Sequence, residues 1–212
     1  MIKSSDYPDT LPLFVLSEAL LLPRTRIQLN VFEPRYLAMV EDVLKTRDRL
    51  IGMIQPQRGA ADGTLYNIGC AGRLSGFIET DDGRYLITLT GLSRYEIIHQ
   101  LEGDTPYTCA QVSWQNFTRD LGGVERSPGF DRARFLHLLE RFFALEELEV
   151  EWDNLQQAEP EMLINSLSML APFSCEDKQA LLEVKTLQER CQMLMVLMEF
   201  ALQRGETGGG LQ

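Results

Sequence analysis

A switch from a strand pattern to a helix pattern around one proline is the sequence feature that most constrains the fold. Ile27, Leu29 and Val31 are separated by polar residues, as in a half-buried strand. Pro34 follows, and its fixed φ and missing N–H suit the first turn of a helix. We therefore predict a strand over 25–31 that leads directly into a helix. The apolar stripe of that helix comprises Tyr36, Leu37, Val40, Val43 and Leu44.

The first half of the chain is otherwise rich in strand patterns. Gly69, Gly72 and Gly76 interrupt one long strand, and glycines within strands mark bulges or bends where a sheet curls. Asp82-Gly83 indicates a tight hairpin turn. Together with the early helix, this pattern predicts a small, mainly antiparallel barrel or sandwich. The further strands are predicted over 11–16, 50–54, 66–80, 85–89, 94–101 and 107–114.

The second half is predicted to be helical. The segment 119–129 contains Gly122-Gly123 and Ser127-Pro128-Gly129 and lacks apolar periodicity, which indicates a boundary. We expect a sheet domain over 1–120, a helical bundle over 121–204 and a flexible tail over 205–212. Helix starts are indicated by a capping residue, a proline or a capping box at Asp131, Pro160, Ser174 with Asp177, and Thr186 with Glu189.

Charge limits the classes of partner. The chain carries 20 Lys and Arg against 31 Asp and Glu, a net charge of -11. Residues 121–212 hold 8 of the basic and 16 of the acidic residues, so the acidity is concentrated in the helical half. Nucleic acid binding is disfavoured because a polyanion requires a basic surface. No apolar stretch is long enough for a membrane span, so we expect a cytoplasmic protein with no membrane partner.

No motif for catalysis or metal binding stands out. The chain has no Gly-Lys pair for a phosphate loop, and neither His99 nor His137 lies near a nucleophile motif. The four cysteines lack metal-ligand spacing, so we expect buried, reduced thiols. The acidic run over 146–153 suits a solvated helix end better than an ion site. We predict no catalytic residue, no metal and no cofactor.

Two sets of residues are candidates for contacts with a peptide or partner. Met193, Met195 and Met198 on the last predicted helix could form an adaptable apolar surface together with Met162 and Met169, although core packing explains the same spacing. Arg73, Arg84 and Arg94 lie around the hairpin strands and could hold a carboxylate, or they could only solvate the outer face of the sheet.

Several motifs together resemble the amino-terminal substrate-binding domain of the Lon (La) ATP-dependent protease family. The most specific is Phe32-Glu33-Pro34-Arg35-Tyr36. The order and spacing of the motifs match over about residues 10–114, and the helical half is also similar. The other motifs are Leu11-Pro12-Leu13-Phe14, Leu21-Leu22-Pro23, Gly69 with Gly72, Asp82-Gly83-Arg84, Gly91 with Arg94-Tyr95, and Glu176 to Glu183.

The resemblance implies an α+β fold, a PUA-like and mainly antiparallel β-barrel with one early helix, followed by an all-helical bundle. It implies a freestanding, non-enzymatic module that recognises unfolded or client proteins, or exposed apolar peptide segments, with a separate protease as a further partner in an adaptor role. The sequence stops before any ATPase or Ser-Lys protease segment. A structural role is expected for the five residues Phe32, Glu33, Pro34, Arg35 and Tyr36, with Glu33 capping the helix or pairing with Arg35.

Two other functions remain open at this point. One is a small-ligand protein or enzyme that uses a cleft between barrel and bundle, with Arg84 or Arg94 holding an anion. The other is RNA binding through the PUA-like barrel, which the net charge opposes.

Overall fold

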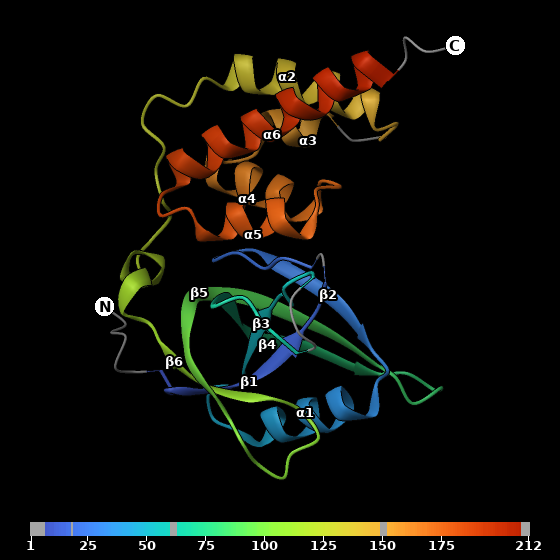
Figure 1. The fold of residues 1–212 in the computed structure, drawn as a ribbon, viewed down its shortest axis with the longest axis vertical. Coiled ribbons are helices and arrows are strands. Elements are labelled where there is room, and N and C mark those ends of the chain that lie inside the picture. Colours follow the sequence, from blue (N-terminus) through green and yellow to red (C-terminus); the bar gives the residue numbers. More distant parts are fainter. Residues whose placement is uncertain (1–6, 18, 60–62, 149–151, 209–212) are drawn as a thin grey trace. The chain divides into compact units, whose positions relative to one another are not determined.

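The computed structural model describes residues 7–17, 19–59, 63–148 and 152–208. The chain separates into two compact units, 1–124 and 125–212, which we call the sheet unit and the helical unit (Figure 1). The elements of the sheet unit are β1 (Thr10–Val15), β2 (Arg26–Val31), α1 (Pro34–Lys45), β3 (Leu50–Ile54), β4 (Ile68–Glu79), β5 (Tyr85–Leu101), β6 (Cys109–Ser113) and the 3₁₀ helix η2 (Gln115–Leu121). Those of the helical unit are α2 (Arg132–Leu145), α3 (Trp152–Gln157), α4 (Pro160–Leu170), α5 (Cys175–Glu183) and α6 (Leu187–Gly208).

The six strands form one mixed sheet in the order β2-β5-β4-β3-β1-β6, with an additional β5–β6 pairing. β1 and β3 are parallel, and every other pairing is antiparallel. Five strands thus form a closed ring of pairings, and β2 lies outside it as a neighbour of β5. The α+β class is as predicted, but the sheet is not the simple antiparallel barrel that the glycine pattern suggested, because β1 runs parallel to β3 and β2 stays outside the ring.

The predicted break within β5 is wrong. The segments 85–89 and 94–101 belong to one continuous strand, whose first half pairs with β2 and whose second half pairs with β6. Gly91 is needed for a close approach and not for a turn: a Cβ on it would lie 2.0 Å from the backbone oxygen of Leu22. Two hydrogen bonds join the segment before β2 to Gly91. The Arg24 N–H donates to the Gly91 oxygen and the Gly91 N–H donates to the Thr25 oxygen, each at 2.8 Å.

The strand-to-helix switch forms as predicted. Pro34 occupies the first turn of α1, and Glu33 precedes it without a side-chain cap hydrogen bond. Glu33 instead pairs with Arg35, whose Nη2 lies 2.7 Å from Glu33 Oε2. Tyr36 is buried, packs on Phe14 with ring centroids 4.3 Å apart, and donates its hydroxyl to the Val15 oxygen at 3.1 Å. Burial is the main cause of a raised pKa for Tyr36.

A second tyrosine connects the loop before β6 to α1. Tyr107 donates its hydroxyl to Asp42 Oδ2 at 3.0 Å. The pKa of Tyr107 is raised to about 12, mainly by burial and secondly by this hydrogen bond. The pKa of Asp42 is lowered, first by the hydrogen bond from Lys45 and then by that from Tyr107. The donor hydroxyl therefore stays protonated and the acceptor stays ionised over the neutral range, which keeps the contact in place.

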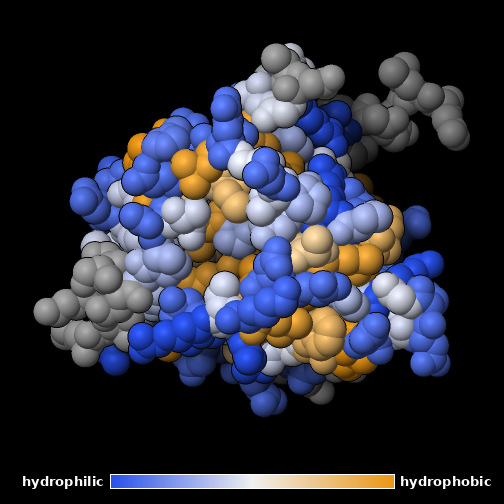
Figure 2. Space-filling model, turned by 90° about the horizontal axis from the view of Figure 1, so that it is seen from below, coloured by the Kyte–Doolittle hydropathy of each residue, from blue (hydrophilic) through white to orange (hydrophobic). Residues whose placement is uncertain are grey.

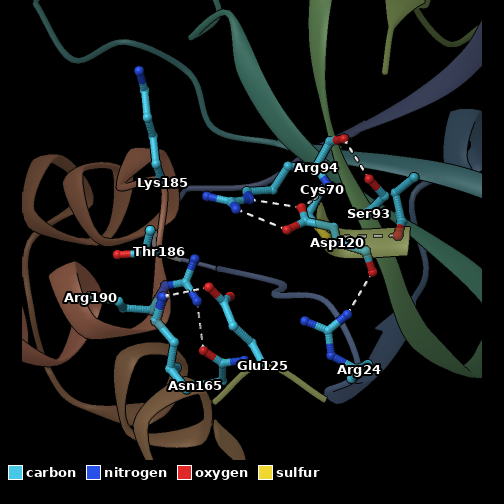
Figure 3. Close-up of polar contacts among 12 residues, drawn as sticks. Arg24, Cys70, Ser93, Arg94, Asp120, Glu125, Asn165, Lys185, Thr186 and Arg190 are labelled. Carbon is cyan, nitrogen blue, oxygen red and sulfur yellow. Dashed lines mark hydrogen bonds and ion pairs between the residues drawn. The ribbon is translucent and has the colours of Figure 1, made fainter. Parts of the chain in front are cut away.

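The interior of the sheet unit contains a buried ion pair. Arg94 on β5 is 2% exposed and binds Asp120 of η2 through two hydrogen bonds, Nε to Oδ2 at 2.8 Å and Nη2 to Oδ1 at 2.9 Å (Figure 3). Its backbone N–H also donates to Asp120 Oδ2. The guanidinium lies 4.6 Å from the ring centroid of Phe117. Arg24 Nη1 donates to the backbone oxygen of Asp120. These contacts fix η2 against β5.

Four helices of the helical unit, α2, α4, α5 and α6, begin where the capping signals predict. The Asp131 side chain accepts from the Arg134 N–H, Ser174 Oγ accepts from the Asp177 N–H at 3.1 Å, and Thr186 with Glu189 forms a reciprocal capping box. Pro160 opens α4. The residues of these helices that are buried together are mostly large and apolar, such as Phe135, Leu139, Phe142, Ile164, Leu181, Leu194 and Met198.

Three details of the helical half differ from the prediction. α2 ends at Leu145 instead of about residue 148, and the short helix α3 was not predicted. α6 continues to Gly208, so a flexible tail is wrong for 205–208, whereas 209–212 lie outside the described residues. The sheet unit ends at Val124, four residues after the predicted boundary at 120, and Asp120 is part of η2.

Candidate functional site: an apolar groove in the helical unit

An open apolar groove of about 400 Å³ lies among the end of α2, α3 and α4. Its floor includes Phe143, Leu163 and Leu167, which also belong to the core of the unit. Its rim is formed by three exposed apolar side chains: Leu148, Met162 and Leu170 are 41%, 62% and 78% exposed. Exposed large apolar groups that gather around a hollow are characteristic of binding sites.

The periodicity of α4 explains the groove. Met162, Ser166 and Leu170 are spaced by four residues and therefore lie along one side of the helix, next to the side that carries the buried Leu163 and Leu167. Packing in the core uses the second stripe and leaves the first open. α4 is thus apolar over more of its circumference than packing within the unit requires.

The opposite wall is α3, a helix of six residues that is too short to be stable alone. Trp152 packs at its start against Phe143, with ring centroids 6.0 Å apart. At its end the Arg132 guanidinium donates to the carbonyl oxygens of Gln156 and Ala158 at 2.9 and 2.6 Å. The last carbonyl groups of a helix have no hydrogen-bond donor within that helix. The Arg132 guanidinium supplies the donors and so holds α3 to α2.

The groove can make apolar contacts with side chains of different shapes. Its lining is mostly aliphatic and aromatic, with Asn154 and Ser166 as the polar residues. Met162 adds a flexible thioether side chain that adjusts to different shapes. Within the described part of the chain, no group of three or more His, Cys, Asp or Glu is placed to hold a metal ion. The groove is therefore suited to burying apolar side chains of another molecule.

The predicted contact residues lie elsewhere. Arg84 is about half exposed at the β4–β5 hairpin and pairs with Asp82 at 3.0 Å. A peptide contact at Arg94 is wrong, because its guanidinium is buried against Asp120. Met198 is 1% exposed and is a core residue, so the packing alternative is correct there. Met193 and Met195 are partly buried against the same core. Among the methionines singled out from the sequence, Met162 is the one at the groove rim.

The motif around Pro34 places one side chain in solvent. Phe32 is 63% exposed, whereas Tyr36 is buried. Arg35 and Tyr36 line a second, more polar hollow of about 380 Å³ beside the loop over 102–108.

Hydrophobic side chains also reach the surface in patches on the face shown in Figure 2.

The cysteines are structural. None of the four, all within the described residues, forms a disulfide bond; three are buried and Cys109 is half-buried. Burial raises the pKa of Cys191 to about 11 and also raises that of Cys109, so both stay protonated thiols near neutral pH.

Comparison with known families decides the assignment. The model of the ATP-dependent protease La (LON) substrate-binding domain matches residues 10–199, which is most of both units. The chain belongs to this family. The Lon-type resemblance inferred from the motif around Pro34 is thereby confirmed.

Relatives and solved structures agree with that assignment. A Lon protease of Dictyoglomus thermophilum is 27% identical over 99% of this chain, and one of Flavobacterium johnsoniae is 22% identical over 100% of this chain. The chain spans about a quarter of the length of these Lon relatives, 27% and 26%. The Lon N-terminal domain protein from Xanthomonas campestris shares the fold with a TM-score of 0.61 and 24% identity, covering 88% of this chain and 97% of that one. The N-terminal domain of a Mycobacterium avium complex Lon protease gives 0.64 at 14% identity, with 90% and 98% covered.

No helix within the described residues is both long and apolar enough to cross a membrane.

Proposed function

We propose that this Lon-type domain recognises exposed apolar segments of client proteins through the groove on its helical unit. The observation that carries the proposal is the row of Met162, Ser166 and Leu170, which leaves two large apolar side chains open beside a hollow floored by core residues. Apolar segments are buried in folded proteins and become accessible when proteins unfold. A groove with this lining therefore favours unfolded chains over native ones.

The matched family is a substrate-binding domain. We therefore assign recognition of protein substrates, and no catalytic step, to these 212 residues. The relatives are named Lon proteases, which supports a further step. We propose that the bound segment is presented to a protease, with this chain acting as an adaptor. The groove is adaptable in shape, which suits many different clients and no single sequence.

A charge on the groove rim is expected to weaken binding of an apolar segment at least tenfold. Leu170 is 78% exposed, so Leu170→Asp changes the rim without disturbing the core. Full burial of a leucine is worth about 1.5 to 3 kcal/mol, which corresponds to roughly ten- to a hundredfold in affinity. Fluorescence anisotropy with a labelled 15-residue peptide that contains three leucines measures the change.

Val196→Asp is the matched control, because Val196 is 58% exposed on α6 and does not line the groove. It is expected to leave the affinity within twofold of the starting protein. Equal weakening by both substitutions, or none by either, contradicts the role of the groove.

A further inference from the structure

β2 is the strand of this sheet with a single partner. Each of the other five strands pairs with at least two neighbours, whereas β2 pairs with β5 alone among the strands that the structure describes. Figure 1 shows β2 at the margin of the sheet. An edge strand presents a row of unpaired N–H and C=O groups, which is a template for another extended chain.

The register shows which groups face outwards. The Gly91 N–H donates to the Thr25 oxygen, and hydrogen-bonded pairs recur at every second residue of an antiparallel ladder. Ile27, Leu29 and Val31 therefore face β5 with their backbone polar groups. The N–H and C=O groups of Arg26, Gln28 and Asn30 point to the open edge. These are three donors and three acceptors over about 13 Å of strand.

The two faces of β2 differ in side-chain chemistry. Val31 is buried on the inner face, together with Ile87 and Leu89 of β5, but Ile27 and Leu29 are only half-buried there. This is the expected result for core-facing side chains that lack a neighbouring strand on one side. A further strand would cover them with its own alternate side chains.

The outer face carries two cations. Arg26 lies opposite Thr90, and Thr90 lies opposite Arg73 on the next strand, so both arginines share one row across the sheet. Both are exposed. Neither guanidinium has a hydrogen bond or ion pair with another residue that the structure describes. In a chain of net charge -11, two exposed arginines in one row are a local site for a carboxylate.

We propose that the free edge of β2 binds an extended peptide segment as a seventh strand. Its alternate apolar residues cover Ile27 and Leu29, and an acidic residue of the opposite alternation reaches Arg26 and Arg73. The groove proposed above takes apolar side chains in any conformation. The β2 edge instead selects an extended backbone with an apolar and acidic alternation, and it stands whether or not the groove binds.

A labelled peptide with the core Asp-Val-Thr-Val-Asp tests the proposal by fluorescence anisotropy, since its symmetric pattern fits β2 in either direction. Two N-methylated versions carry the methyl groups on complementary alternate residues. In the antiparallel direction, which is the commoner one for strand pairs, the Asp and Thr N–H groups face β2 and the Val N–H groups face away. We expect one version to lose at least tenfold in affinity and the other to stay within threefold of the parent. Equal affinities for the two versions overturn the proposal.

Protein variants locate the site. Gln28→Pro removes one outward N–H at an edge position where proline is tolerated, and Arg26→Glu reverses the charge that faces the peptide. Each is expected to weaken binding at least fivefold while the circular dichroism spectrum stays unchanged. Leu170→Asp in the groove is expected to have no effect on this peptide, which separates the two sites. Unchanged binding in both β2 variants contradicts the proposal.

Self-association has a distinct outcome in sedimentation velocity. A concentration-dependent dimer that Gln28→Pro abolishes would assign the edge to a second copy of the chain and overturn the peptide proposal. A monomer at every concentration, together with peptide binding, supports it.

Discussion

Replacing Asp120 by alanine is expected to lower the free energy of unfolding of the sheet unit by about 3 to 5 kcal/mol, because it leaves a buried guanidinium without its counter-ion. The loss removes both side-chain hydrogen bonds to Arg94 and the one from the Arg94 N–H. Urea unfolding followed by Trp114 fluorescence, in a Trp152→Phe background, measures the effect, since Trp114 is buried in the sheet unit.

The exposed pair of Arg84 and Asp82 provides the control for Asp120→Ala. Its atoms are 3.0 Å apart and both side chains are more than half exposed. Exposed ion pairs contribute at most about 1 kcal/mol, so Asp82→Ala is expected to change the urea midpoint little. If Asp120→Ala costs no more than Asp82→Ala, the buried pair is not what holds η2 to β5.

Gly91→Ala is expected to destabilise the same unit by about 3 kcal/mol, at the upper end of typical overpacking effects. The added methyl would lie 2.0 Å from the Leu22 oxygen, and backbone cannot move away as a side-chain end can. The hydrogen bonds from Arg24 and to Thr25 would be strained as the two segments separate. Thermal unfolding by circular dichroism and urea unfolding by Trp114 fluorescence both report the loss.

Gly103→Ala is the matched substitution for Gly91→Ala, because a Cβ at Gly103 meets nothing within 4 Å. It is expected to change stability by less than about 0.5 kcal/mol, as surface substitutions usually do. Equal stability of the two alanine variants would show that Leu22 and Gly91 do not approach each other as closely as the structure places them.

Features fixed by neighbouring residues could be predicted from the sequence. Pro34 sets the start of α1 through its own ring, and the Thr186 and Glu189 capping box forms from groups three residues apart. The strand over 50–54 was predicted with its observed bounds for the same reason, since the apolar run and its polar flanks are contiguous.

Features that depend on distant partners could not be predicted. Gly91 resembles a strand break until Leu22, 69 residues away in sequence, is seen to pass over it. Arg94 alternates like a surface residue, and only Asp120, in a segment that the sequence analysis assigned to a boundary loop, accounts for its burial. No local pattern encodes either contact.

The groove falls between these cases. Met162 was considered only beside the three methionines of α6 that were the candidate contacts, and those pack in or against the core. An apolar surface on α4 wider than a single stripe was the available signal. Which of its stripes stays open depends on how α2 and α3 pack, and α3 was not predicted at all.

The most direct test of apolar recognition by the groove uses the methionine methyl groups as reporters. The chain contains eight methionines, including Met162 at the rim and Met198 in the core of the same unit. With ¹³C-methyl methionine, NMR titration with the leucine-containing peptide is expected to shift the Met162 resonance and leave that of Met198 in place. Shifts confined to Met193 and Met195, or no shift at Met162 at saturating peptide, would contradict the account.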